Sequence, residues 1–206
     1  MRCIKGKITP GDKALHIIRR HGGIIRTGQA LQAGIHPRIL YRLLDDELLE
    51  RLSRGVFRLT DRAPISDPDL IIVAARVPKA VICLLSALSF HELTTQVPHS
   101  VSIALARGSV TPRLEYPPLS IHRFSKETLQ AGVDEHYIDD VPIRIYCPEK
   151  TLADCFKFRN KIGMEVVLEA LKLYKLRKEF KAARILRYAK ICRVEKVMRP
   201  YLEMSV

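Results

Sequence analysis

The order of turns and apolar stretches in the first 60 residues constrains the fold more than any other feature of this chain. Gly22 and Gly23 end a first helical pattern, and Gly34 ends a short second one that Thr27 can cap. A third helical pattern follows, and Gly55 then lies in a short connection that favours a β-hairpin. The predicted elements are helices over residues 12–21, 28–33 and 37–47, a β-capable pair at 24–25, and strands over 48–52 and 56–60. This order is typical of a winged helix-turn-helix domain.

A proline-containing segment, residues 63–68, is the predicted linker to a second domain. Beyond it, the pattern predicts helices over 67–76 and 79–93, strands over 100–106, 119–123, 133–138 and 141–146, and a helical C-terminus from Pro148 with breaks near Gly163, Arg177 and Arg193. The sequence therefore predicts an α+β protein. A winged helix-turn-helix occupies residues 1–63, and a mixed α+β domain with a helical C-terminus occupies residues 64–206.

The chain carries a formal net charge of +13, which suits a polyanionic partner. Residues 1–63 hold 13 Lys and Arg against 6 Asp and Glu, and residues 172–199 hold 11 against 2. The positive charge is thus concentrated near the two ends. No apolar run approaches the roughly 20 residues of a membrane helix, and Met1–Pro10 is followed by no apolar core of a secretion signal. We therefore expect a cytoplasmic protein with no membrane partner.

The cysteines predict neither a disulfide framework nor a zinc site, because their number is odd and they form no C-x-x-C pair. The five are Cys3, Cys83, Cys147, Cys155 and Cys192. Most are expected to be small apolar residues in a reducing compartment. No metal and no cofactor are expected.

Two groups of residues invite a catalytic interpretation, but their spacing argues against it. Ser86 and His91 lie five residues apart on one predicted helix, so their side chains diverge by more than a right angle, and no G-x-S-x-G elbow is present. The second group comprises Asp139, Asp140, Glu149 and Lys150, a set that could gather a magnesium ion. Its last two members are adjacent and follow Pro148, which favours a helix N-terminus instead. The protein is predicted not to be an enzyme.

The predicted third helix carries the residues expected to read DNA. Its apolar face comprises Ile35, Ile39, Leu40, Leu43 and Leu44, and its opposite face comprises Arg38, Tyr41, Arg42 and Asp45. Exposed arginines suit the major groove, because arginine can bond two acceptors on guanine. His36 lies near the helix N-terminus, where base edges are approached. Tyr41 has an alternative role in packing against the first helix.

The hairpin and the second helix supply further expected contacts. Arg51, Arg54 and Arg58 lie on or beside the hairpin and could enter a minor groove or touch phosphate. Thr27 and Gln29, at the start of the second helix, can bond phosphate. The alternative is that these are solvated residues of a small basic domain.

A basic helical stretch near the C-terminus has two interpretations. Phe180, Ala183, Leu186 and Ile191 can face a core, while Lys181, Arg184, Arg187 and Lys190 cover the other half. The cationic half is either a solvated face or a second phosphate-binding surface, which would add affinity without sequence information. A membrane-surface helix is disfavoured, because its apolar side lacks large aromatic residues.

Six segments resemble the AbiEi antitoxin family. They are HGGIIRT (21–27), AGI (33–35), LYRLL (40–44) and LERLSRGVFRL (49–59) in the first domain, and ICLLSALSFHELT (82–94) and PEKTLADCFKFR (148–159) in the second. The first four are shared with many winged regulators, whereas the last two are more specific. Together they span nearly the whole chain.

The resemblance implies an antitoxin of a type IV toxin–antitoxin system, acting in abortive infection against phage. Its winged domain would repress its own operon by binding inverted repeats in the upstream double-stranded DNA. Its second domain would oppose a nucleotidyltransferase-like toxin, without any need for direct contact. Two copies are expected on the operator, as a dimer or as monomers made cooperative by bent DNA. The alternatives are a nuclease tethered by a winged domain and a protein that clamps the toxin directly.

Overall fold

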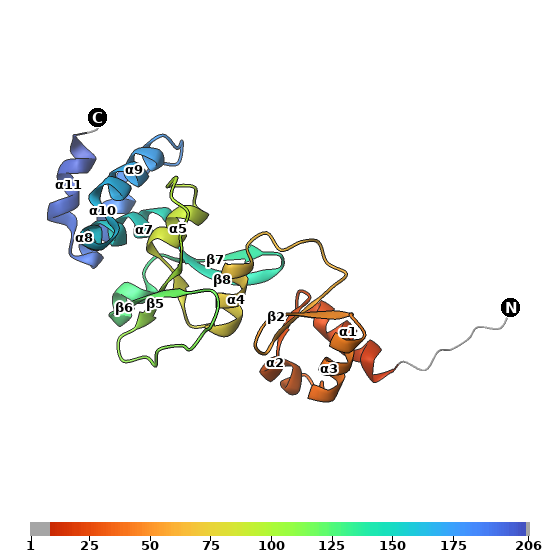
Figure 1. Ribbon diagram of the computed structural model, residues 1–206. Coiled ribbons are helices and arrows are strands. Elements are labelled where there is room, and N and C mark those ends of the chain that lie inside the picture. Colours follow the sequence, from red (N-terminus) through yellow and green to blue (C-terminus); the bar gives the residue numbers. More distant parts are fainter. Residues whose placement is uncertain (1–8, 205–206) are drawn as a thin grey trace. The chain divides into compact units, whose positions relative to one another are not determined.

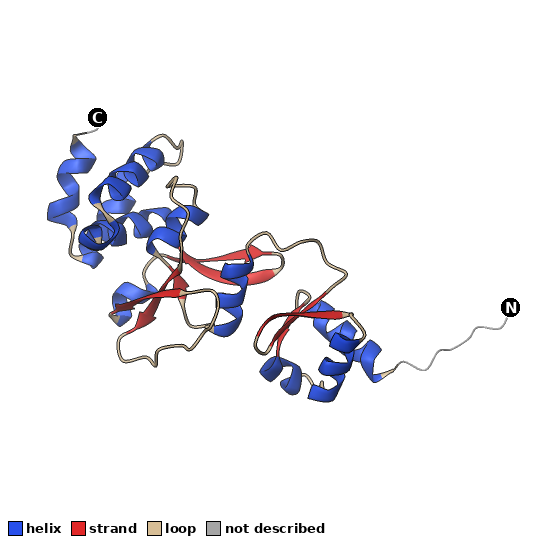
Figure 2. Ribbon diagram, viewed as in Figure 1, coloured by secondary structure: helices blue, strands red, loops and turns tan. Residues whose placement is uncertain are grey.

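The computed structural model describes residues 9–204 and shows a mixed α and β protein, which confirms the predicted class (Figures 1 and 2). The chain forms two compact units. The first runs up to Pro78 and includes Tyr137–Pro142, and the second comprises Lys79–His136 and the chain from Ile143 onward. Cys3 and most of Met1–Pro10 lie outside the described residues.

The first unit is a winged helix-turn-helix, as predicted. Its elements are α1 (Pro10–Arg20), β1 (Ile24–Arg26), α2 (Thr27–Gln32), α3 (Pro37–Asp45), β2 (Leu49–Ser53), β3 (Val56–Leu59) and α4 (Pro68–Arg76). The three strands form an antiparallel sheet in the order β1-β3-β2. Gly22 and Gly23 both have positive φ, of 77° and 81°, so the turn after α1 needs residues without a side chain.

Two layers of apolar side chains hold this unit together. Successive residues of a strand point to opposite faces, so Ile25 and Phe57 join the core formed with Ile18 and Leu40, while their neighbours point the other way. Helix α4 contacts all three strands. This packing explains why α4 belongs to the first unit, whereas the sequence placed the domain boundary after residue 63.

The second unit is built around a five-stranded mixed sheet in the order β6-β5-β4-β8-β7. Its elements are β4 (Val81–Ile82), α5 (Leu84–Phe90), β5 (Val101–Ala106), β6 (Leu119–Phe124), α6 (Lys126–Gln130), β7 (Val133–Ile138), β8 (Val141–Tyr146), α7 (Pro148–Lys157), α8 (Arg159–Ile162), α9 (Met164–Lys175), α10 (Ala182–Cys192) and α11 (Glu195–Glu203). β5 pairs parallel with β6 and antiparallel with β4. Helices α5, α7, α9, α10 and α11 contribute most of the buried side chains of the main core, and strands of the sheet contribute the others together with short connections.

One prediction for this unit was wrong, and one element was missed. The apolar stretch 79–93 was predicted as one helix but divides into β4 and α5. A short, fully buried strand and a buried helical segment have the same uniform apolar pattern, so periodicity does not separate them. The short helix α6 was not predicted.

The four cysteines in the described part of the chain are free and buried, at positions 83, 147, 155 and 192.

Candidate nucleic-acid interface

Helix α3 presents one buried and one exposed face. Pro37 begins the helix, and the Nδ1 atom of His36 accepts a hydrogen bond from the backbone N–H of Arg38 at 3.2 Å, which caps it. Leu40 and Leu43 are buried against the core of the first unit. The exposed side carries His36, Arg38, Tyr41 and Arg42. The hydrophobic core therefore holds α3 in place and leaves its polar residues in solvent.

The exposed arginines of α3 and of the β2–β3 hairpin, the wing, have no acidic partner. Within residues 9–204, Arg38, Arg42, Arg51 and Arg54 are exposed and take part in no ion pair. Arg19, in contrast, pairs with Asp61 at 2.9 Å. An exposed cation without a partner is free to neutralise a phosphate group. We call the exposed residues of these two elements, His36, Arg38, Tyr41, Arg42, Arg51 and Arg54, the α3–wing surface.

Tyr41 joins the two parts of this surface. Its ring packs edge-on to that of Phe57, with 6.4 Å between centroids, and the guanidinium carbon of Arg51 lies 5.9 Å from the Tyr41 centroid. The tyrosine thus contacts the wing, while 54% of its area stays exposed. These contacts couple α3 to β2.

Arg58 was expected to contact DNA, and the structure contradicts this expectation. The residue is 7% exposed, and its Nη1 atom donates to the Glu50 carboxylate at 2.6 Å. A second hydrogen bond runs from Nη2 to the carbonyl oxygen of Ala63. β3 is the central strand of its sheet and all four of its residues are buried, so Arg58 serves the fold.

Thr27 and Gln29 are engaged within the first unit. The backbone N–H of Thr27 donates to the carbonyl oxygen of Gly55 at 3.0 Å, and its hydroxyl lies 3.4 Å from the same oxygen. The prediction that Thr27 caps α2 was wrong, because it is the first helical residue; the Gln29 side-chain oxygen instead accepts from the backbone N–H of Arg26. Thr27 therefore ties the start of α2 to the wing, whereas Gln29 closes the first turn of α2, and both residues are half-buried.

Gly55 and Arg76 fix the tip of the wing. Gly55 has a φ of 74°, and a Cβ atom there would lie 3.2 Å from the hydroxyl of Thr27. Nη1 of Arg76 donates to the carbonyl oxygen of Arg54 at 2.9 Å. The backbone at the tip is therefore anchored, and the Arg54 side chain is presented from a fixed position. The sequence carried no signal for the contribution of Arg76.

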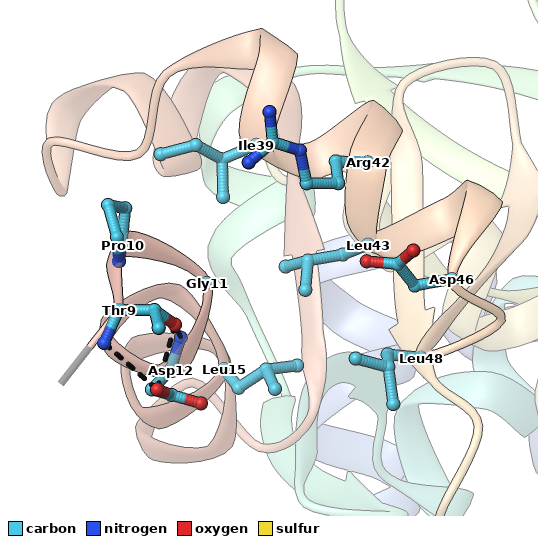
Figure 3. A pocket seen from close by; sticks show the side chains of 10 residues that line it. All are labelled: Thr9, Pro10, Gly11, Asp12, Leu15, Ile39, Arg42, Leu43, Asp46 and Leu48. Carbon is cyan, nitrogen blue, oxygen red and sulfur yellow. Dashed lines mark hydrogen bonds between the residues drawn. The ribbon is translucent and has the colours of Figure 1, made fainter. Parts of the chain in front are cut away.

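A pocket of about 250 Å³ lies between the start of α1 and α3 (Figure 3). Its lining is Thr9, Pro10, Gly11, Asp12, Leu15, Ile39, Arg42, Leu43, Asp46 and Leu48. Thr9 and Asp12 cap α1 reciprocally, with backbone-to-side-chain hydrogen bonds of 3.1 and 2.9 Å. A threonine and an acid three residues apart are a sequence signal for such a cap, which places the start of α1 at Pro10 and not at the predicted residue 12. The start of α1 is thus a close neighbour of Arg42.

The structure does not bring the candidate catalytic groups together. The Ser86 hydroxyl accepts from the Ser102 N–H at 2.9 Å, whereas Nε2 of His91 lies 2.7 Å from the carbonyl oxygen of Tyr146. Burial lowers the pKa of His91. Each side chain therefore has its own local partner.

The acidic set proposed for a nuclease is also divided. Asp139 accepts hydrogen bonds from Ser66, and Asp140 pairs with Arg62 at 3.0 Å, all within the first unit. Glu149 and Lys150 are buried on α7 in the second unit. Among the residues that the structure describes, no cluster of three or more His, Cys, Asp or Glu could hold a metal ion.

On α10, the cationic residues differ in their environment. Arg184 pairs with the buried carboxylate of Glu149 at 3.4 Å, so part of its charge is used within the second unit. Lys181, Arg187 and Lys190 are exposed and have no ion pair in the described part of the chain. The predicted apolar face was partly wrong: Ala183 is exposed, and the buried residues are Ile185, Tyr188, Ala189 and Cys192. The fully buried residues of α10 therefore lie on a different side of the helix from the one predicted.

The fold defines a winged helix-turn-helix protein with a second, α+β unit. Residues 12–60 match the family described as "Transcriptional regulator, AbiEi antitoxin". This match confirms the resemblance over the winged segment and supports a role as an antitoxin or regulator, and a family of transcriptional regulators implies DNA binding.

A solved structure supports the fold of the longer chain. The crystal structure of RV2827C protein from Mycobacterium tuberculosis is similar with a TM-score of 0.54 and 14% sequence identity, over 94% of this chain and 80% of that chain. At this identity the likeness concerns the fold alone. No curated protein matches the chain. Over residues 9–204 we find no helix with the length and apolar character that crossing a membrane requires.

Proposed function

We propose that the chain is a sequence-specific autorepressor of the antitoxin type, which binds inverted repeats upstream of its own operon in the cytoplasm. One observation carries the proposal: Arg38, Arg42, Arg51 and Arg54 are exposed on two adjoining elements, α3 and the wing, and form no ion pair with any residue from 9 to 204. The family match over residues 12–60 supports it independently of this geometry.

In this proposal α3 enters the major groove and the wing lies beside it. Arg38 and Arg42 read base edges or fix the register on phosphates, because a guanidinium presents paired donors that match the acceptors of guanine. Arg54 reaches the minor groove or the backbone from the anchored tip of the wing. The contacts among Tyr41, Arg51 and Phe57 keep the two elements in register. Two copies occupy the two half-sites, as a dimer or through bent DNA.

Helix α10 extends the proposal to the second unit. Lys181, Arg187 and Lys190 carry three exposed charges that have no acid partner among the described residues. Contacts from them to phosphate would raise affinity for any DNA sequence equally. The second unit is further proposed to oppose a nucleotidyltransferase-like toxin in abortive infection, on the strength of the segments 82–94 and 148–159.

The test is a footprint and band-shift series on the DNA upstream of the chain's own operon. Arg42→Ala should lower operator affinity by about 5- to 150-fold, which corresponds to the 1–3 kcal/mol of a bidentate base contact, and should leave the unfolding midpoint unchanged. Arg19→Ala is the matched control, because it removes an arginine from the same unit that is already paired with Asp61. Its operator affinity should change less than threefold.

Equal band shifts from the wild-type chain and Arg42→Ala would refute the assignment of α3 as the reading helix. Equal losses in both variants would show that binding depends on total charge alone, and would refute sequence-specific reading by Arg42.

A further inference from the structure

Arg76, the last residue of α4, adjoins the tip of the wing although it lies outside the residues predicted to contact DNA. Its Nη1 atom donates to the carbonyl oxygen of Arg54 at 2.9 Å and lies 3.8 Å from the position that a Cβ atom of Gly55 would take. The side chain is exposed, and this hydrogen bond uses one of its five N–H donors. Arg76 therefore brings a second guanidinium to the turn that carries Arg54.

Arg26, the last residue of β1, approaches the same turn from the other side. It pairs with Val56 in the β1–β3 register, and the residue after it, Thr27, donates its N–H to the carbonyl oxygen of Gly55 at 3.0 Å. The Gln29 side-chain oxygen accepts from the Arg26 backbone N–H at 3.0 Å and from its Nε atom at 3.3 Å. Gln29 thus positions the guanidinium and leaves both of its Nη groups available.

The turn therefore gathers three arginines whose charge is not neutralised within the first unit. None of the three forms an ion pair with any residue from 9 to 204. Of the acids on the adjoining elements, Glu50 pairs with Arg58. Asp67 and Asp69 lie at the other end of α4, and Asp69, the nearer to Arg76, is seven residues before it, about 10 Å along the helix.

We infer that Arg26 and Arg76 bind, together with Arg54, a phosphate of the DNA backbone at the edge of the α3–wing surface. The inference rests on the proposed DNA binding, which already places Arg54 at the duplex. Guanidinium groups held close together repel one another, and a phosphate relieves this repulsion while it accepts their paired N–H donors. The contact would fix the register of the wing on the duplex and carry no sequence information.

The first test measures DNA affinity against salt concentration for an Arg26→Gln, Arg76→Gln double variant. Glutamine keeps an amide donor for the Arg54 carbonyl oxygen but removes the charge. The plot of log affinity against log salt concentration should become shallower by about 0.9, because one phosphate contact is lost. The change should be the same for the operator and for an unrelated duplex. Lysine at both positions retains the charges and should retain the wild-type slope.

Arg19→Gln with Arg62→Gln is the matched control. It removes two arginines of the same unit that already pair with Asp61 and Asp140, at 2.9 and 3.0 Å. Its salt slope should equal that of the wild type, although its net charge equals that of the double glutamine variant.

The second test locates the phosphate and needs only Arg76→Gln, at an exposed position, should Arg26→Gln lower the unfolding midpoint in urea. The footprinted operator is synthesised as a series in which one phosphate at a time becomes an uncharged methylphosphonate. The wild type should lose affinity by about fivefold at the phosphate beside the wing, the upper end for an exposed ion pair. Arg76→Gln should lose nothing further at that position and should keep the losses at the others. Arg42→Ala should keep them all.

Four results would overturn the inference. They are an unchanged slope in the double glutamine variant, an equal change in the control, a lysine variant whose slope matches the glutamine variant, and a methylphosphonate series in which Arg76→Gln equals the wild type. The third would assign Arg76 to anchoring the wing alone.

The proposed repressor function has its own readout, the preference for upstream DNA over an unrelated duplex. The glutamine variants should retain this preference, because a phosphate contact favours no sequence. A chain without the preference, whose binding to an unrelated duplex still showed the shallower slope in the glutamine variant, would refute the repressor function and leave the phosphate site in place.

Discussion

The α3–wing surface and the interior of the second unit use basic side chains in opposite ways. On the α3–wing surface, Arg38 and Arg42 are exposed and have no acidic partner in the part of the chain that the structure describes. In the second unit, Lys150 is fully buried, pairs with the equally buried Asp154, and lies with Nζ 4.1 Å from the ring centroid of Tyr146. A buried cation needs a partner to be tolerated at all, whereas an exposed cation costs the fold little.

This difference separates residues whose charge stays available to a partner from residues whose charge is used within the fold. Arg58 shows that the distinction follows environment rather than position in the chain, since it lies only four residues from Arg54 and is buried against Glu50. A guanidinium held by a carboxylate and a carbonyl has few donors left for DNA. An exposed guanidinium without partners keeps all five.

The largest expected effect is on the buried pair of the second unit. Lys150→Met keeps the apolar stem but leaves the Asp154 carboxyl buried without its cation. Burial already raises the pKa of Asp154, and Lys150 opposes that rise. The free energy of unfolding should fall by about 3–5 kcal/mol, measured by urea denaturation at pH 7. Lys157→Met, at an exposed position of the same helix, should change it by about 0.5 kcal/mol or less.

A double variant keeps this prediction informative if Lys150→Met folds poorly. Asp154→Leu added to Lys150→Met removes both charges, and should recover most of the lost stability because an apolar pair can replace a buried ion pair. A double variant no more stable than the single one would show that the pair does more than balance charge.

Much of the fold was predictable because local rules determined it. In the first unit, Gly22, Gly23 and Gly55 mark the turns, and the apolar repeat through Leu40 and Leu43 identifies the buried face of α3. The division of 79–93 into β4 and α5 was not predictable in the same way. There the tertiary pairing of Val81 and Ile82 with β5 decides the structure, and a single sequence does not display it.

For the candidate site, the exposed face of α3 was predictable from helical spacing alone. The separate roles of Arg54 and Arg58 were not, because both lie in a basic hairpin and only the three-dimensional structure shows that β3 is the central strand. Thr27 and Gln29 were predicted to contact phosphate through their side chains and backbone N–H groups. The sequence did not show that their side chains already have partners within the first unit, Gly55 for Thr27 and Arg26 for Gln29. Residues with several possible hydrogen-bond partners are difficult to assign for this reason.

Arg54 and Arg58 compare an exposed arginine with a buried one inside a single hairpin. Arg58→Met should lower the free energy of unfolding by about 1.5–3 kcal/mol, the range for hydrogen bonds that involve a charged group. Arg54→Met should leave stability within about 0.5 kcal/mol but weaken operator binding. Urea denaturation and band shifts on both variants separate the two roles. If Arg58→Met instead weakened operator binding and left the free energy of unfolding unchanged, Arg58 would have to leave its buried position to contact DNA. Burial in the free protein would then not distinguish the two arginines.

The smallest expected effect concerns α10, where exposed cations could serve either solvation or phosphate binding. Arg187→Ala with Lys190→Ala should make the plot of log affinity against log salt concentration shallower by about 1.8, because each phosphate contact contributes about 0.9 to its slope. The loss of affinity in this double variant should be equal for operator and unrelated DNA. Lys161→Ala with Lys172→Ala removes two charges elsewhere in the second unit and should leave the slope as it is. An unaltered slope in the α10 variant would show that the cationic side of this helix is only solvated. The proposed DNA contacts would then be limited to the α3–wing surface.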